Sequence, residues 1–207
     1  MIDATGFFKP GYKVNSLGYR TQEFNEIDWS NSYVIQGCSA CFGVGIPDEE
    51  QTVAACLSRK LGAPVINLGV SGSGIQVQYM NMIEMLEQGI RPKGVFIIWP
   101  NADRYPLMEH SKILNIGPWS DQKQLDWMLN NNSRNHNLWH ARAYQLMLKL
   151  AGIPLYHVSH HYTNCELGLT DVFTGNFIDR GTDGQHWGPL MAEHVASLLY
   201  QKHQSSL

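Results

Sequence analysis

The chain has 207 residues, of which 43% are hydrophobic, 11% are aromatic and only 16% are charged, and its formal net charge is -3. This composition is typical of a globular protein with an ample core, and it excludes a disordered or fibrous chain. Because no broad basic surface is expected, neither nucleic acid nor a membrane is predicted as a partner.

Strands and helices are predicted to alternate along most of the chain. Residues 1–32 mix Gly, Pro, Asn, Ser and aromatic residues without a clear period, so we expect an arm that wraps over one domain formed by residues 33–207. Residues 100–120 and 160–186 are expected to be irregular. The hydrophobic pattern predicts strands at 33–36, 64–68, 94–99 and 153–158, and helices at 48–61, 75–88, 121–129, 137–150 and 189–202.

This alternation favours the α/β class, with a flavodoxin-like, mostly parallel sheet between two layers of helices. In such sheets the ligand site gathers at the carboxyl ends of the strands. Each of the first three strands is followed by a short polar or glycine-rich segment, so these segments should meet at one edge of the sheet. They are Gly37-Cys38-Ser39, Asn67 to Gly72 and Trp99-Pro100-Asn101.

Two kinds of chemistry fit the segment after the first strand. The spacing of Cys38 and Cys41 fits a redox dithiol or half of a metal site, whereas Ser39 between them fits a hydroxyl nucleophile. A serine needs a base that accepts its proton, and histidine has a suitable pKa range. Asp183 and His186, just before the last helix, have the spacing of a carboxylate that orients an imidazole.

In this order, the four segments resemble the SGNH hydrolases, also called GDSL-like esterases and lipases. The resemblance covers residues 33 to about 200, and Asn15 to Arg20 is similar to a segment that precedes the nucleophile block in some members. The similar blocks are Gly37-Cys38-Ser39 with Phe42-Gly43 (nucleophile), Asn67 to Gly72 (glycine), Trp99-Pro100-Asn101 (asparagine) and Asp183-Gly184-Gln185-His186 (terminal Asp-x-x-His).

The resemblance implies the three-layer α/β/α fold of that family and a serine esterase. Ser39 would be the nucleophile, His186 its general base and Asp183 the group that holds the imidazole. The oxyanion hole would consist of the backbone N–H groups of Ser39 and Gly72 and the side-chain amide of Asn101. The expected reaction is hydrolysis of a small acyl ester through an acyl-Ser39 intermediate, with an acetyl group on a carbohydrate favoured, and without a cofactor or metal.

Two positions depart from the family pattern. Cys38 stands where the family has an aspartate beside the serine, and Asn101-Ala102-Asp103 replaces the usual Gly-x-Asn-Asp. Both changes affect the local hydrogen bonding of the turns. A catalytically weak or inactive SGNH-like binding or structural module is therefore a second hypothesis.

A CxxC redox protein is the third hypothesis. A reactive thiol needs a depressed pKa, for instance at a helix N-terminus, but Phe42 to Pro47 follow the pair and no helix is expected directly after it. His157, His160 and His161 lack a carboxylate or cysteine at ligand spacing, so no metal site is predicted. The glycine-rich residues 69–74 lack the Lys of a phosphate-binding loop, so no nucleotide is predicted either.

No targeting or membrane segment is recognised. The first residues lack a basic stretch followed by an apolar core, and no apolar run approaches the ~20 residues that cross a bilayer. Cys38, Cys41, Cys56 and Cys165 are spread unevenly in a chain that is long enough to fold without disulfides. Reduced thiols and, by default, a cytoplasmic location are expected, and the oligomeric state stays open.

Overall fold

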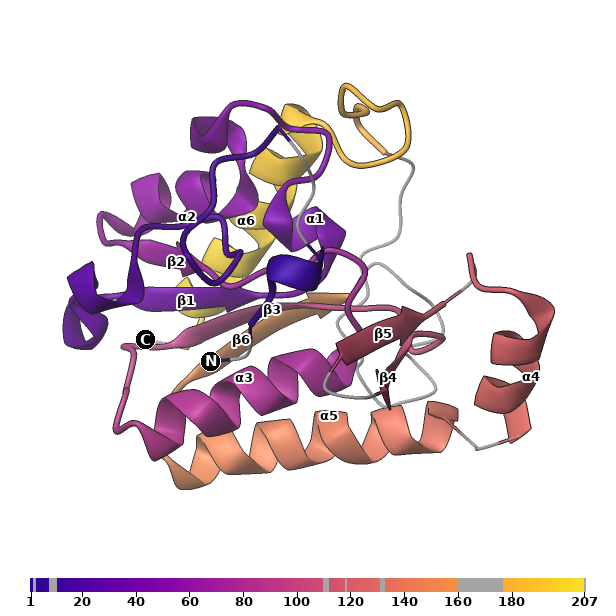
Figure 1. The fold of residues 1–207 in the computed structure, drawn as a ribbon. Helices are drawn as coiled ribbons and strands as arrows, with labels where there is room; N and C mark the ends of the chain where they lie inside the picture. Colours follow the sequence, from indigo (N-terminus) through magenta and orange to yellow (C-terminus); the bar gives the residue numbers. More distant parts are fainter. Residues whose placement is uncertain are drawn as a thin grey trace.

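A four-stranded sheet forms the centre of the computed structural model (Figure 1). The structure describes all residues except 2, 8–10, 110–111, 118, 131–132, 160–176 and 207. All strands are parallel and their spatial order is β2-β1-β3-β6, as in the first four strands of a flavodoxin-like sheet. The α/β class with a parallel sheet is therefore confirmed. The strands are β1 (Tyr33–Gln36), β2 (Val65–Asn67), β3 (Val95–Trp99) and β6 (Leu155–Ser159).

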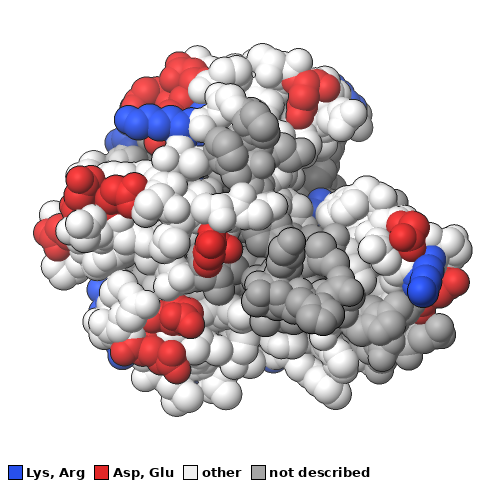
Figure 2. All heavy atoms as spheres, viewed as in Figure 1, with Lys and Arg blue, Asp and Glu red and all other residues white. Residues whose placement is uncertain are grey.

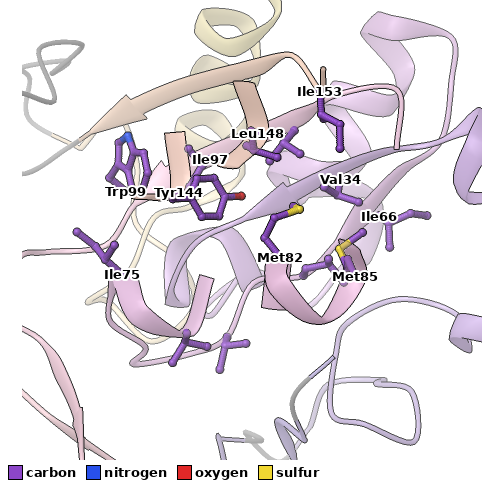
Figure 3. Close-up of a cluster of buried hydrophobic side chains, with 14 of the residues drawn as sticks. Val34, Ile66, Ile75, Met82, Met85, Ile97, Trp99, Tyr144, Leu148 and Ile153 are labelled. Carbon is purple, nitrogen blue, oxygen red and sulfur yellow. The ribbon is translucent and has the colours of Figure 1, made fainter. Parts of the chain in front are cut away.

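Helices cover both faces of this sheet (Figure 1). Successive strand residues point to opposite faces, and accordingly Val34 packs in one core cluster while Ile35 packs in the other. Figure 3 shows the cluster around Val34, where Met82 and Tyr144 approach the strands from their helices. The helices are α3 (Ile75–Glu87) and α5 (Ser133–Leu150) on this face, and α2 (Val53–Leu61) and α6 (Pro189–Gln204) on the other.

The helix predicted at residues 48–61 is two pieces in the structure. A 3-10 helix, η4 (Glu49–Gln51), is followed by Thr52 in an extended conformation, and α2 begins only after it. The Thr52 hydroxyl accepts a hydrogen bond from the N–H of Ala55, which caps α2. Gly62, at φ 63, ends the helix in the left-handed conformation that glycine allows.

The prediction of an irregular loop at residues 100–120 was wrong. The chain forms an antiparallel hairpin here, β4 (Tyr105–Glu109) paired with β5 (Lys112–Ile116), followed by α4 (Gln122–Asn130). Pro106 suggested a loop because proline cannot donate to a ladder, but both strands of a two-stranded ribbon are edge strands and tolerate it.

Helix α5 begins at Ser133, four residues before the predicted start at residue 137. The tyrosine hydroxyl of Tyr105, in the hairpin, lies 3.4 Å from Nδ1 of His136 in the first turns of α5. A tertiary contact of this kind outweighs the weak helix preference of the local sequence, and a pattern within the chain does not reveal it.

In the part of residues 1–32 that the structure describes, the chain forms three short 3-10 helices and contributes buried side chains to the domain. The Tyr19 hydroxyl donates to Asn81 Oδ1 in α3 at 2.8 Å, and both side chains are fully buried. Arg20 is buried as well. The short helices are η1 (Thr5–Phe7), η2 (Phe24–Glu26) and η3 (Trp29–Asn31).

Charged side chains of both signs are scattered in small groups over the face shown in Figure 2. Within the described part of the chain, no helix combines the length and apolar character that crossing a membrane requires.

Candidate active site

Ser39 lies directly beyond the carboxyl end of β1, in a strand–turn–helix junction. Gly37 makes this turn possible because a Cβ there would lie 2.8 Å from the carbonyl oxygen of Ile98 in the neighbouring strand β3. Ser39 is the first residue of α1 (Ser39–Phe42), a single helical turn that Gly43 ends at φ 86. The serine is 7% exposed, so the turn presents its side chain from a nearly buried position.

Asp183 and His186 form a hydrogen-bonded pair, as their spacing predicts. His186 Nδ1 lies 2.6 Å from Asp183 Oδ2, and Asp183 Oδ1 accepts from the backbone N–H groups of Gln185 and His186, each at 3.0 Å. Burial alone would raise the pKa of Asp183, but these bonds and the imidazole outweigh it and lower the pKa to about 2. The carboxylate is therefore charged at neutral pH and fixes the orientation of the imidazole ring.

The lowered pKa of Asp183 predicts a pH-dependent stability. Because the folded pKa is about 2 and the ordinary value is 3.8, the stabilisation is complete above pH about 4 and is lost as the pH falls through about 2. The Tm difference between wild type and Asp183→Asn should therefore shrink over this range. Thermal unfolding followed by circular dichroism measures it, with the exposed Glu87→Gln as control. A difference that stays constant from pH about 6 to about 2 would contradict the assigned cause.

Ser39 and His186 line the same cavity, which has a volume of about 200 Å³. Between these two described residues, however, the structure contains no hydrogen bond. The Ser39 hydroxyl lies 4.0 Å from Cys38 Sγ, which is at the limit of even a weak bond to sulfur. The other described residues of the cavity wall are Cys38, Ala40, Arg104, Phe177, Gln185 and Trp187.

Gly72 and Asn101, the remaining predicted oxyanion donors, do not line this cavity. The glycine segment nevertheless lies beside the nucleophile turn, because the N–H of Val70 donates to Gly37 O at 3.0 Å. Gly72 has φ 77, a conformation that glycine adopts without strain. Asn101 Oδ1 accepts a hydrogen bond from the N–H of Asp103 at 3.0 Å. The other end of the amide, Nδ2, is therefore the donor.

The two cysteines next to Ser39 are free thiols. As expected, no helix begins directly after the pair, since the next one, η4, starts at Glu49. A helical turn between the two cysteines was not expected: α1 begins at Ser39 and contains Cys41. Burial nevertheless raises the pKa of Cys41 well above its ordinary value, the opposite of what thiol exchange needs. Its Sγ lies 3.7 Å from Asn67 Oδ1 in the interior. Cys41 therefore does not fit the reactive thiol that the redox hypothesis needs.

No group of three His, Cys, Asp or Glu side chains in the described part of the chain is arranged to hold a metal ion. His157 is in β6, while His160, His161 and Cys165 lie outside the described residues.

The sequence patterns missed Arg104, Phe177, Gln185 and Trp187 as cavity residues. Trp187 is adjacent to His186, so its position is a direct consequence of the predicted pair. Arg104 lies three residues after Asn101. A basic residue so close to the carboxyl end of β3 is the one signal in the sequence that could have indicated a site residue here. Phe177 carries no such signal.

Comparison with known proteins gives little further guidance. No family model and no curated protein matches the chain. Among solved structures, the chain is similar to a candidate lipolytic protein of the G-D-S-L family from Desulfitobacterium hafniense DCB-2, with 16% identity and a TM-score of 0.37. The match covers 81% of this chain and 99% of that one. A similarity at this level assigns neither family membership nor activity.

Proposed function

We propose that this protein is an SGNH-like serine hydrolase that cleaves small acyl esters. One observation carries the proposal: Ser39, at the carboxyl end of β1, shares a cavity with His186, and His186 is hydrogen-bonded through Nδ1 to the charged Asp183. A nucleophile, a base and a group that orients the base thus come from two distant segments of the chain.

In the proposed reaction, Ser39 Oγ attacks the ester carbonyl while His186 Nε2 takes the hydroxyl proton. The imidazolium then gives this proton to the departing alcohol, which leaves an acyl group on Ser39. Water attacks the acyl-serine in the same manner and regenerates the hydroxyl. The serine and histidine must approach each other for the first step, and such bonds often tighten only when substrate is bound.

The oxyanion of the tetrahedral intermediate needs preset donors. As the first residue of a helix, Ser39 has an N–H without an intrahelical partner. We propose Gly72 and Asn101 as the further donors, supported by the bond that joins the glycine segment to Gly37 and by the fixed amide of Asn101. Their position outside the cavity wall means that a bound acyl group would have to extend toward them.

The size of the cavity favours a short acyl group such as acetyl. At about 200 Å³ it is smaller than the ~300–1,000 Å³ typical of pockets for drug-sized ligands. An acetylated carbohydrate fits if the sugar remains outside the cavity and only the acyl group enters.

A fluorophosphonate probe tests the nucleophile directly. We expect covalent labelling of the wild-type protein at Ser39, located by mass spectrometry, together with turnover of 4-nitrophenyl acetate. Ser39→Ala should lose both, while Cys38→Ala retains the label because the thiol is not the reacting atom. Labelling at another residue would overturn the assignment.

The inactive-module hypothesis has one observation in its favour, the missing hydrogen bond between Ser39 and His186. A folded wild-type protein that neither reacts with the probe nor hydrolyses the ester would support that hypothesis.

A further inference from the structure

Arg104 places a positive charge in the wall of the proposed catalytic cavity. Arg104 is one of the residues that line the cavity, together with Ser39 and His186. Two of its guanidinium nitrogens, Nε and Nη1, are buried and make no hydrogen bond. Buried polar groups almost always have partners, and a buried guanidinium that has none is unfavourable unless a ligand supplies them.

Nothing within the described residues neutralises this charge. Two carboxylates of the segment that carries His186 have other partners: Asp183 accepts from His186, and Asp179 accepts from the N–H groups of Leu190 and Met191 at the start of α6. No described carboxylate forms an ion pair with Arg104. The partner that this guanidinium lacks must therefore come from outside that part of the chain.

The arginine is also held in place. Asn137 in α5 donates to the backbone oxygen of Arg104 at 3.1 Å and to that of Ala102, and Gln76 in α3 donates in turn to the Asn137 amide. The guanidinium carbon lies 5.2 Å from the ring centroid of Trp119, a cation–π contact that helps to fix the side chain. A charge that is fixed before binding loses little entropy when a ligand binds.

From these contacts we infer that the cavity recognises an ester that carries an anionic group, and that Arg104 binds this group. The inference rests on the proposed function, since it names the substrate class of the same site. A carboxylate suits the guanidinium because two parallel N–H donors match its two oxygens. The charged group belongs either to the acyl part or to the alcohol part of the ester, and matched substrates distinguish the two.

The test compares each anionic ester with a neutral analogue. Mono-4-nitrophenyl succinate against 4-nitrophenyl butyrate probes the acyl side, and 4-acetoxybenzoate against its methyl ester probes the alcohol side. For one pair, the wild-type protein should prefer the anionic member by about 10-fold or more in kcat/KM, the size expected of hydrogen bonds to a charged group. Arg104→Met should remove this preference, so that the ratio of kcat/KM for the anionic member to that for the neutral member falls to about 1.

Two further variants serve as controls. Arg104→Lys keeps the charge and should retain part of the preference, and it also covers the case in which Arg104→Met fails to fold. Arg142→Met removes an exposed arginine on α5 and should change neither ester of a pair. Equal kcat/KM for both members of both pairs in the wild-type protein would overturn the inference.

Binding of a simple anion separates this inference from the proposed function. Isothermal titration calorimetry with benzoate and with succinate should show binding of one of them to the wild-type protein, weakened at least about 10-fold in Arg104→Met. If this occurs but no ester is hydrolysed, the proposed function fails and the anion site stands. If esters are hydrolysed but neither anion binds through Arg104, the anion site fails alone.

Discussion

Replacing His186 by alanine is expected to lower kcat for 4-nitrophenyl acetate by at least about 1000-fold. Without the imidazole, the base proposed to take the proton of Ser39 is missing, and a neutral hydroxyl is a poor nucleophile. KM should change little, because in the proposed mechanism the imidazole acts on the serine rather than on the acyl group in the ground state. The loss should be smaller for Asp183→Asn, which leaves the imidazole in place but removes the charge that orients it.

Steady-state kinetics with two controls makes this result specific. His194→Ala removes an exposed histidine eight residues further along, on α6, and should leave kcat unchanged. Added imidazole should restore part of the activity of His186→Ala, because the small base can occupy the space of the missing ring. An unaltered kcat in His186→Ala would mean that another group activates the nucleophile.

The central sheet could be predicted because it follows from local patterns. All four strands of the central sheet were predicted within two residues at either end, since continuous apolar runs bounded by glycine and polar residues are distinctive. The hairpin β4–β5 could not be predicted, because a two-stranded ribbon buries little and tolerates the proline that normally excludes a strand.

The candidate site could be predicted only in part, for a similar reason. The pairing of Asp183 with His186 depends on a spacing of three residues, which the sequence displays directly. The cavity depends on how distant segments pack. Arg104 enters it because Asn137, thirty-three residues away, binds its backbone, and no periodicity within either segment records this contact.

Arg20, in the arm formed by residues 1–32, shows how a distant residue can position the site. Its Nη1 donates to the backbone oxygens of Gly43 and Ile46 at 2.9 and 2.8 Å, and its Nη2 donates to that of Pro47 at 3.0 Å. The guanidinium also lies 4.8 Å from the ring centroid of Tyr12. Burial lowers the pKa of Arg20, whereas the nearby Glu49, Tyr12 and Asp48 raise it. The guanidinium remains charged, and the three carbonyl groups accept its hydrogen bonds.

Arg20 donates to the loop of residues 43–47, which lies between the two parts of the proposed triad, Ser39 on one side and the Asp183–His186 pair on the other. This loop follows α1, which carries Ser39, and its Gly45 accepts from the N–H of Thr182 at 2.8 Å, next to Asp183. The approach is close: a Cβ at Gly45 would lie 3.0 Å from Asp183 Oδ1. A shift of this loop would therefore move the Asp183–His186 pair relative to the serine.

Arg20→Met should accordingly affect both stability and turnover. The change removes a charged donor from three backbone oxygens, of which, among the described residues, only Gly43 O keeps a second bond, from the N–H of Ile46. We expect it to lower the free energy of unfolding by about 3 kcal/mol, or Tm by on the order of 10 °C. At temperatures where the variant is still folded, kcat should fall at least about 10-fold with KM nearly unchanged, because misplacement of a base by a fraction of an ångström slows proton transfer.

Two comparisons distinguish positioning from a general loss of stability. Arg59→Met also removes an arginine that donates to a backbone oxygen, that of Glu50 at 2.7 Å, but its side chain is 54% exposed, so Tm and kcat should change little. Arg20→Lys keeps a charge but lacks the planar fork that reaches several carbonyl groups, and should recover stability more fully than kcat. If Arg20→Met lowered Tm but left kcat of the folded protein intact, the residue would support the fold without positioning the catalytic pair. If Arg20→Met instead lowered both Tm and the kcat of the folded protein while KM stayed unchanged, catalysis would depend on residues 1–32 as well.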